Sequence, residues 1–350
     1  MKPYTVSDSI LFVNHHRYRR SGHLGHALVE YAPGRLLAFY SDCAGSRHNG
    51  HNGFGWMNYK RSLDGGGTWG EPETLEYSKE LFLDGEVSVS CEKAVCTNRG
   101  TIVLSCLINE YAPAWEPWRA PTYLRSFDGG FSWTPPRVLS EQPGRVYDMR
   151  YRDGVIYALH FANDGRKSFC GNAPEHQYKL LVSADDGETF TERSTLPFDT
   201  MGRGYGSLCF RPDGTLLAYI YNSRDEYTMD VCVSHDLGMT WNAPVPSYVG
   251  KRIRNPQTAY YGGRYFLHGR SGCVDRTKPM NFVLYTSDDG ILWDNGVFIR
   301  ETPAGAHGGA AYYSNNLIVH TPDGRERLLI QASDAYEAAR TDIRHWWVDA

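Results

Sequence analysis

The chain lacks the segments that direct many proteins to a membrane or hold them in one. No apolar run approaches the length of a membrane-spanning helix. The first residues, MKPYTVSDSI, have no apolar core of the kind that a secretory signal peptide needs. The sequence as written therefore predicts a cytoplasmic protein without a membrane partner. A chain trimmed of its leader would read the same, and it would be secreted or periplasmic.

CxxC pairs and an excess of positive charge are also missing. The eight cysteines include no CxxC pair, so neither a zinc site nor a disulfide framework is indicated. Stretches such as LSCLI and DVCVS place cysteine inside apolar runs, where a buried free thiol is expected. The formal net charge is −4, and no basic stripe interleaved with aromatic residues is present. We therefore expect no nucleic-acid partner.

Helical periodicity is almost absent, and a short repeated turn is prominent instead. The pattern Ser-x-Asp-x-Gly-x-Thr/Ser-aromatic occurs as SLDGGGTW, SFDGGFSW, SADDGETF and SHDLGMTW, with a degenerate copy TSDDGILW. The copies start at Ser62, Ser126, Ser183, Ser234 and Thr286, so consecutive starts lie 64, 57, 51 and 52 residues apart. Ser and Asp bond to the turn's own backbone, Gly permits positive φ, and the aromatic side chain packs on a neighbouring sheet. These duties are structural, so we expect catalysis elsewhere.

A second repeated feature, an apolar run followed by a glycine-centred turn and another apolar run, occurs six times. HALVEYAPGRLLAFY is the first copy and NNLIVHTPDGRERLLIQ the last. Six such hairpins predict an all-β fold, a six-bladed β-propeller of four-stranded antiparallel blades with the repeated turns between third and fourth strands. We expect one domain over residues 1–350, with a ring-closing strand from SDSILFVNHH. The expected blades lie near 20–75, 84–140, 143–197, 201–248, 250–300 and 305–350.

The repeated turns resemble the Asp boxes, or BNR repeats, of the sialidase (neuraminidase) superfamily. GRLLAFYSD…MNYKRSLDGGGTWGEP is similar to the first blade of a sialidase in order and spacing, and YYSNNLIV…LLIQASDAY resembles a later blade. The resemblance implies a sialidase-like propeller with glycoside hydrolase activity. It also implies a site with an arginine triad for the substrate carboxylate, a Tyr–Glu nucleophile pair and an Asp acid/base.

Carried over position by position, the resemblance matches part of that site. The nucleophilic tyrosine corresponds to Tyr313, and Tyr205 stands where the family has its glutamate. Asp42 lies in the loop that carries the family's acid/base, and the fifth blade offers Arg254 and Arg270 for a carboxylate. The segment SGHLGHAL, where the family has its first arginine, contains none. The catalytic pattern therefore departs from that of standard sialidases.

The hairpin alignment locates a site without reference to any family. The innermost strand of every blade starts at the same rim of the central channel, and the second strand returns to that rim. The residues expected near the strand starts are His26, Glu92, Arg145, Tyr205, Arg254 and Tyr313. Those near the ends of the second strands are Asp42, Asn109, His160, Asn222, Arg270 and Asp334. Such a ring of polar side chains predicts a site for a polar, anionic ligand.

The loop SDCAGSRHNGHNGFG adds His48 and His51 at the same mouth. Imidazole titrates near neutrality, which suits general acid/base catalysis. A His-x-x-His metal site is the rival interpretation, but no third ligand stands out in the sequence. We therefore expect no metal and no cofactor.

These residues predict a mechanism on an acidic sugar. Arg254 and Arg270 would hold its carboxylate by bidentate hydrogen bonds, and His48 or His51 would protonate the leaving oxygen or remove a proton. Tyr313 would act as nucleophile or stabilise a positively charged transition state. The expected catalytic residues are His48, His51, Tyr313, Tyr205 and Asp42. The expected substrate-binding residues are Arg254, Arg270, His26, Arg145 and Glu92.

Three functions are compatible with these residues. The first is an exo-acting glycoside hydrolase of sialidase type on a glycan that contains sialic or uronic acid. The second is a polysaccharide lyase on the same fold, in which His or Tyr removes the C5 proton of a uronic acid while arginine neutralises its carboxylate. The third is a propeller that binds glycans without cleaving them.

Overall fold

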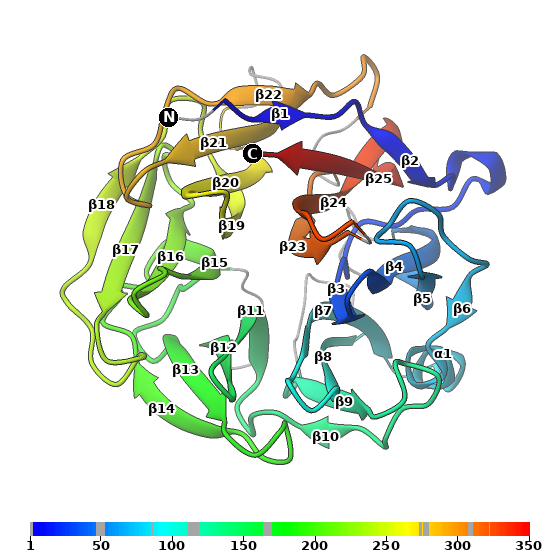
Figure 1. The fold of residues 1–350 in the computed structure, drawn as a ribbon, viewed down its shortest axis with the longest axis horizontal. Helices are drawn as coiled ribbons and strands as arrows, with labels where there is room; N and C mark the ends of the chain where they lie inside the picture. The colour runs from blue at the N-terminus through cyan, green and yellow to red at the C-terminus, as the bar shows by residue number, and fades with distance from the viewer. Residues whose placement is uncertain are drawn as a thin grey trace.

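Six antiparallel sheets stand side by side around a central channel (Figure 1). The computed structural model describes residues 3–46, 53–85, 87–110, 119–163, 170–272, 275, 280–306, 311–321 and 323–350. The arrangement confirms the predicted all-β, six-bladed propeller of four-stranded blades. Radial stacking buries sheet faces that an isolated blade would leave exposed.

Each of the first five blades runs outward from the channel in chain order. Blade 1 holds β3 (Leu28–Ala32), β4 (Arg35–Ser46), β5 (Gly53–Ser62) and β6 (Glu73–Thr74). Blade 2 holds β7 (Val87–Cys96), β8 (Ile102–Glu110), β9 (Thr122–Ser126) and β10 (Arg137–Val138). Blade 3 holds β11 (Gly144–Arg152), β12 (Val155–Ala162), β13 (Gln177–Ser183) and β14 (Thr191–Thr195). Blade 4 holds β15 (Arg203–Phe210), β16 (Leu216–Asn222), β17 (Thr228–Ser234) and β18 (Val245–Tyr248). Blade 5 holds β19 (Arg254–Tyr261), β20 (Arg264–Arg270), β21 (Phe282–Ser287) and β22 (Val297–Arg300).

Blade 6 joins the two ends of the chain. Its inner strands are β23 (Ser314–His320), β24 (Glu326–Glu337) and β25 (Arg340–Asp349). The outer strands β1 (Thr5–Val6) and β2 (Ile10–Val13), from the amino-terminal end, both pair antiparallel with β25. Figure 1 shows these blue strands beside the red carboxy-terminal strand. The prediction that the segment 7–16 supplies a ring-closing strand is confirmed by β2.

One α-helix, α1 (Glu76–Leu83), was not anticipated from the sequence. It follows β6, and Tyr77 and Leu81 pack against a core cluster shared by blades 1 and 2. The Ser78 hydroxyl accepts a hydrogen bond from the Met57 amide at 3.0 Å. Eight residues are too few for the helical period to stand out in a window of about 11 to 18 residues. A 3-10 turn, η1 (His16–Tyr18), precedes blade 1.

The repeated turns are closed by their own side chains. In the first, the Ser62 hydroxyl donates to Asp64 Oδ1 at 2.8 Å, and Asp64 accepts from the Thr68 amide at 2.8 Å and hydroxyl at 2.7 Å. The Gly66 amide donates to Ser62 Oγ at 2.9 Å, with Gly66 at φ 84°. Equivalent bonds centre on Asp128, Asp185 and Asp236. Each of these turns lies between the third and fourth strands of its blade, as predicted.

The fifth turn is one residue shorter than the predicted frame, which began at Thr286. Here Ser287 donates to Asp289 Oδ1 at 3.0 Å, and the Gly290 amide donates to Ser287 Oγ at 2.9 Å. Thr286 bonds instead to Asp294, outside the turn. The assignment of Thr286 to the first position was therefore wrong, because the sequence offers two overlapping frames and only the backbone path selects between them.

The aromatic residue of each turn packs on the preceding blade. Trp241 Nε1 donates to Ser194 Oγ of blade 3 at 2.9 Å, and Trp293 Nε1 donates to Ser247 Oγ of blade 4 at 3.0 Å. Trp69 lies edge-on to Phe12 of β2, with ring centroids 5.0 Å apart. The turns therefore fasten neighbouring blades to one another.

The channel has two different mouths. At one, which we call the hairpin mouth, the innermost strands end in glycine turns, and all six glycines have positive φ: Gly34, Gly100, Gly154, Gly214, Gly263 and Gly324. The Gly65 amide donates to Gly34 O at 2.8 Å, so the repeated turn lies on the same side. At the other, which we call the strand-start mouth, the innermost strands begin. Five of the predicted site residues line a hollow at this second mouth: His26, Glu92, Arg145, Tyr205 and Tyr313.

None of the seven cysteines in the described part of the chain belongs to a disulfide, and Cys43, Cys91, Cys106, Cys209 and Cys232 are buried. This agrees with the expected thiols, and Cys273 lies outside the described residues. Neither helix within the described ranges is long and apolar enough to cross a membrane.

Candidate functional site at the strand-start mouth

Four of the six innermost strands carry a β-bulge near the strand-start mouth. The register shifts at Glu92 in β7, at Tyr147 in β11, at Tyr205 in β15 and at Asn255 with Pro256 in β19. A bulge turns an extra side chain out of the normal alternation of a strand. The side chains of Glu92, Tyr147, Tyr205 and Asn255 all line one small hollow of about 30 Å³.

Two of these bulge residues have unusual backbone conformations. Tyr205 has φ 36° and Asn255 has φ 56°, values in the left-handed region that side chains with a Cβ rarely adopt. Strained backbone of this kind costs about 1–3 kcal/mol and is concentrated at functional sites. The strained residues here face the hollow.

A chain of hydrogen bonds crosses the hollow from blade 2 to blade 6. Arg145 donates to Glu92 Oε2 from Nε at 2.9 Å and from Nη2 at 2.7 Å. Arg145 Nη1 also donates to the Tyr205 hydroxyl at 3.3 Å, and Tyr205 donates to the Tyr313 hydroxyl at 3.4 Å. The expected site residues Glu92, Arg145, Tyr205 and Tyr313 are therefore in direct contact.

Two arginines of blade 5 lie beside this chain. Arg254 and Arg270 are directly opposite each other in the register of β19 and β20, with exposures of 8% and 2%. Like charges in that position repel. Arg254 Nη1 lies 3.5 Å from Glu226 Oε1, and the Arg270 guanidinium lies 5.2 Å from the Tyr313 ring centroid. A buried pair of guanidinium groups beside a tyrosine is suited to an anionic ligand.

His23 and His26, just before β3, are held neutral by burial. Burial, with His26, Arg270 and Arg145 nearby, lowers the pKa of His23 well below its usual value. Burial also lowers the pKa of His26 to about 4, and its Nε2 lies 3.0 Å from the His23 carbonyl oxygen. The His23 ring is 5.1 Å from that of Tyr313. The same burial and arginine charges that keep this imidazole neutral disfavour its protonated form.

A polar network closes the waist of the channel beneath the hollow. Lys93 donates to Gln257 and, at 2.6 Å, to Asn315 Oδ1. Its ammonium also lies 3.3 Å from Asp148 Oδ1. Burial lowers the pKa of Lys93 to about 8, although Asp148 opposes that shift. Because Lys93 lines the cavities on both sides, this network separates the two mouths.

Asp148 is the centre of the waist and is fully buried. It accepts from the amides of Met149 at 2.8 Å and Leu208 at 2.7 Å, and from Ser207 Oγ at 3.0 Å. Arg150 donates to it from Nε at 3.1 Å and Nη2 at 3.0 Å. Burial alone would raise the pKa of Asp148, but Arg150 and Lys93 outweigh it, so the pKa is lowered.

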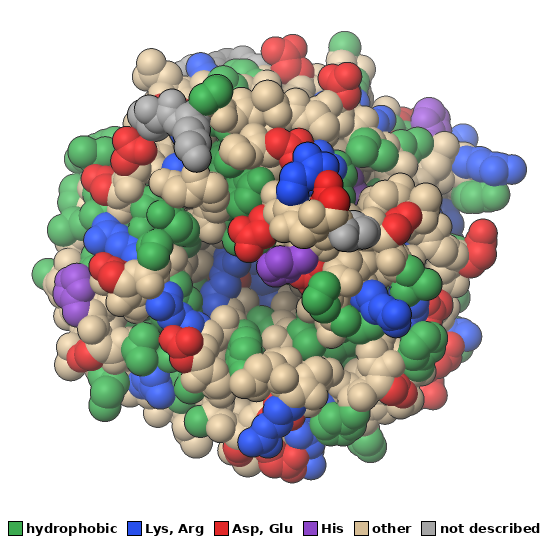
Figure 2. Space-filling view, viewed as in Figure 1, with side chains coloured by type: hydrophobic (Ala, Val, Ile, Leu, Met, Phe, Trp, Pro, Cys, Tyr) green, Lys and Arg blue, Asp and Glu red, His purple; other side chains and the backbone are tan. Residues whose placement is uncertain are grey.

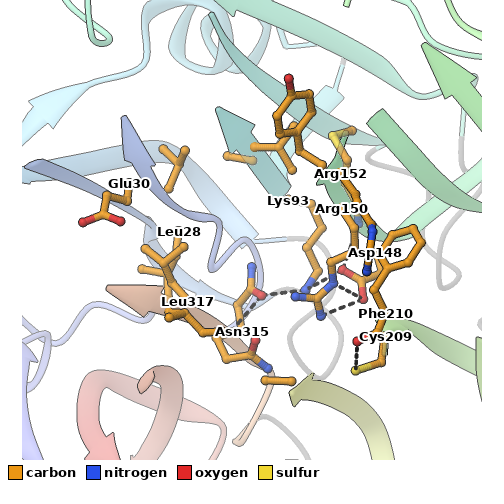
Figure 3. A pocket seen from close by; sticks show the side chains of 18 of the residues that line it. Leu28, Glu30, Lys93, Asp148, Arg150, Arg152, Cys209, Phe210, Asn315 and Leu317 are labelled. Carbon is orange, nitrogen blue, oxygen red and sulfur yellow. Dashed lines mark hydrogen bonds and ion pairs between the residues drawn. The ribbon is translucent and has the colours of Figure 1, made fainter. Parts of the chain in front are cut away.

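The larger cavity, of about 690 Å³, opens at the hairpin mouth. Figure 2 shows this larger cavity at the middle of the ring, with Lys and Arg side chains deep inside it. Figure 3 shows Lys93, Arg150 and Asp148 turned toward one another, with Leu28 and Leu317 across from them. Lys93 and Arg150 share the single Asp148 carboxylate. Ion pairs also hold arginines at the strand-start mouth, where Arg145 pairs with Glu92 and Arg254 with Glu226.

The structure brings most of the predicted site residues together. His26, Glu92, Arg145, Tyr205 and Tyr313 line the hollow. Arg254 and Arg270 lie at its edge in blade 5.

Asp42 is placed apart from the hollow. It is held by an ion pair with Arg20 and accepts from Asn58 Nδ2 at 3.2 Å. Asp334, from the second-strand set, pairs with Arg300 and Arg344. His48 and His51 lie outside the described residues.

Sequence reasoning missed several residues of the site. Asn255, Glu226, Lys93 and Asp148 are buried polar groups at the mouth or waist, and none was singled out. The dipeptide Asn255-Pro256 was the one available signal, because Asn-Pro favours turns and breaks in a regular strand. The bulges themselves depend on pairing between strands, which the sequence pattern does not display.

No group of three or more His, Cys, Asp or Glu side chains is placed to hold a metal ion among residues with described positions.

Comparison with known proteins finds likeness in structure alone. No protein-family profile matches the chain, and no curated protein sequence matches it. A protein of unknown function from Dyadobacter fermentans superposes with a TM-score of 0.76 at 15% identity, over 100% of both chains. The Hadza microbial sialidase Hz136 superposes with a TM-score of 0.68 at 17% identity, over 96% of this chain and 67% of that one. A leech intramolecular trans-sialidase, complexed with 2,7-anhydro-Neu5Ac, superposes with a TM-score of 0.63 at 12% identity, over 99% of this chain and 70% of that one. The chain thus shares the propeller fold of sialidases.

Proposed function

We propose that the protein is a carbohydrate-active enzyme that cleaves an acidic glycan at the strand-start mouth, as an exo-acting glycoside hydrolase of sialidase type. The observation that carries the proposal is the buried cluster of Arg145, Arg254 and Arg270 around Tyr205 and Tyr313. Guanidinium groups bind carboxylates by charge-assisted hydrogen bonds, which are about twice as strong as neutral ones. The shared fold of sialidases supports the same class of substrate.

Tyr313 is the residue proposed to act at the anomeric carbon. Its oxygen would give up its proton to solvent and attack that carbon as the glycosidic C–O bond breaks, and the leaving oxygen would take a proton from solvent; water would then release the sugar from the tyrosine. Alternatively, the hydroxyl would stabilise the positive charge that develops on that carbon. Tyr205, which stands where the resemblance places a glutamate, donates to Tyr313 and accepts from Arg145. A neutral phenol is a weaker base than a carboxylate, so Tyr313 would be activated less directly than in the Tyr–Glu pair.

A specific observation favours β-elimination as the second candidate. The His23 ring lies 5.1 Å from the Tyr313 ring and its imidazole is neutral, which puts a nitrogen base beside the tyrosine. In that reaction His23 or Tyr313 would take the C5 proton of a uronate, the C4–O bond would break, and a double bond would form between C4 and C5. Arg270 would neutralise the charge that builds on the carboxylate.

The test is incubation with sialyllactose and, separately, with uronate-containing oligosaccharides. Release of reducing sugar without absorbance from a conjugated enoate supports hydrolysis, and a gain in that absorbance supports the lyase. Binding without product from either substrate would contradict the enzyme proposal and leave a glycan-binding propeller.

Variants sharpen this test. Tyr313→Phe should lower kcat by about 10²-fold or more. Arg270→Ala should mainly raise KM, because it removes a charge-assisted contact with the carboxylate. Tyr59→Phe is the matched control, since Tyr59 lies in the third strand of blade 1 and its hydroxyl donates to Gly130 O of blade 2 at 3.1 Å. Equal activity of Tyr313→Phe and Tyr59→Phe would remove Tyr313 from the mechanism.

A further inference from the structure

Two side chains that line the hollow have polar atoms without a hydrogen-bond partner in the part of the chain that the structure describes. They are Glu92 Oε1 and both amide atoms of Asn255, Oδ1 and Nδ2. The Glu92 side chain is 9% exposed and Asn255 is 3% exposed, so water outside the protein does not satisfy them. Buried polar groups are almost always paired, and each unpaired one destabilises the fold. Two such residues at one hollow indicate that a ligand group completes them.

The size of the hollow limits what can enter. Its volume of about 30 Å³ corresponds to a single water-sized group. Glu92 Oε1 and Asn255 Oδ1 can only accept hydrogen bonds, whereas Asn255 Nδ2 can only donate. A hydroxyl group donates one hydrogen bond and can accept another, so it can pair with Glu92 Oε1 and Asn255 Nδ2 together. A carboxylate oxygen does not, because the Glu92 carboxylate would repel it.

Both residues are held in place by the surrounding structure. Arg145 binds Glu92 through Oε2, which leaves Oε1 toward the hollow. Asn255 is fixed by its bulge at φ 56°, with Pro256 following it. The hydroxyl-bearing Tyr313 lines the same space. The donors and acceptors are therefore arranged before a ligand arrives, which lowers the cost of binding.

We propose that the hollow is a hydroxyl subsite of the glycan site. One hydroxyl of the acidic sugar donates to Glu92 Oε1 and accepts from Asn255 Nδ2, while the sugar carboxylate lies toward Arg254 and Arg270, outside the hollow. This inference rests on the proposed glycan site at this mouth. Glu92 and Asn255 then determine which sugar is accepted, because a sugar that lacks this hydroxyl leaves both groups unpaired.

The experiment is calorimetric binding of N-acetylneuraminic acid, glucuronic acid and the monodeoxy derivatives of each. We expect the wild-type protein to bind one of the acids. Its affinity should fall about 10- to 100-fold when one particular hydroxyl is removed from that sugar, and by less when any other hydroxyl is removed. In Asn255→Gly the glycine tolerates the positive φ of this position, so the backbone is kept while the amide group is removed. The affinity of this variant for the parent sugar should be about as low as the affinity of the wild type for that deoxy derivative. Glu92→Gln should behave in the same way. Asp153→Gly, also at a positive φ but in the exposed hairpin turn after β11, is the matched control.

Three results separate the possibilities. If Asn255→Gly and Glu92→Gln weaken the parent and all deoxy sugars by the same factor, the residues are merely structural and the subsite is refuted. If the wild type binds neither acid, or loses no affinity with any single hydroxyl, the subsite is also refuted. Selective binding without turnover would refute the enzyme proposal and leave the subsite standing. Should Glu92→Gln fail to fold, Asn255→Gly alone decides, because it leaves the ion pair of Glu92 with Arg145 intact.

Discussion

Replacing Asp148 by alanine tests whether the waist of the channel holds the propeller together. The carboxylate is fully buried and accepts hydrogen bonds from Met149, Leu208, Ser207 and Arg150, besides its contact with Lys93. These partners belong to blades 2, 3 and 4, so the substitution loosens three blades at once. It also leaves the Lys93 ammonium without its buried carboxylate.

The expected loss is about 3–5 kcal/mol of unfolding free energy, the range found when one partner of a buried ion pair is removed. A 350-residue chain has an unfolding entropy of about 0.7 kcal/mol/K, so this corresponds to a fall in Tm of about 4–7 °C. Denaturant titration at pH 7, followed by tryptophan fluorescence, measures the loss directly, and calorimetry measures Tm. Asp8→Ala, at an exposed aspartate, is the control and should stay within about 0.5 kcal/mol.

The pH dependence gives an independent check. Since the folded pKa of Asp148 is lowered, its stabilisation is complete above the unfolded pKa of about 3.9 and is lost as the pH falls through the folded value. Because the Asp148 carboxylate takes up a proton in the wild type in strong acid, the difference between wild type and Asp148→Ala should shrink below about pH 4. If the unfolding free energy of Asp148→Ala at pH 7 lies within about 1 kcal/mol of the wild-type value, this role for Asp148 is refuted. Lys93 and Arg150 would then have found other partners.

Two further substitutions test other features of the fold. His160 is fully buried with both ring nitrogens unpaired, so His160→Leu should raise the unfolding free energy by about 1–2 kcal/mol at pH 7. Burial and Lys179 lower the pKa of His160 to about 3, so the wild type loses up to ~1.4 kcal/mol of unfolding free energy per pH unit as the pH falls from about 6.5 to 3. The variant has no imidazole at this position and should not show this loss. Parallel pH profiles of the two proteins in denaturant titrations would contradict the prediction. In the fifth repeated turn, Asp289→Ala should lower the unfolding free energy by about 1–2 kcal/mol, whereas Asp288→Ala should leave it almost unchanged. A larger loss from Asp288→Ala than from Asp289→Ala would restore the frame that starts at Thr286.

The number of blades and the conformation of their turns could be predicted from the sequence because both depend on interactions between near neighbours. The hydrogen bonds of the first turn all fall between Ser62 and Thr68. The hairpin glycines mark positions with positive φ, where a Cβ would be strained, so they are visible one residue at a time. The near-regular spacing of these local signals is enough to predict a six-fold ring. The same alignment predicted that Glu92, Arg145, Tyr205 and Tyr313 share a mouth, since equivalent positions in a ring share one level.

What each of those residues contacts was decided only by the tertiary structure. The bulges at Glu92, Tyr205 and Asn255 arise from the pairing of each strand with its neighbour, and they change which side chains point into the hollow. The waist joins Lys93 to Asn315 across 222 residues of sequence. A buried charge is stable only beside a partner of opposite sign, and that partner comes from another blade whose approach is fixed when the ring closes. The local pattern therefore determines the ring and its repeated turns, whereas the closed ring determines which polar groups are paired.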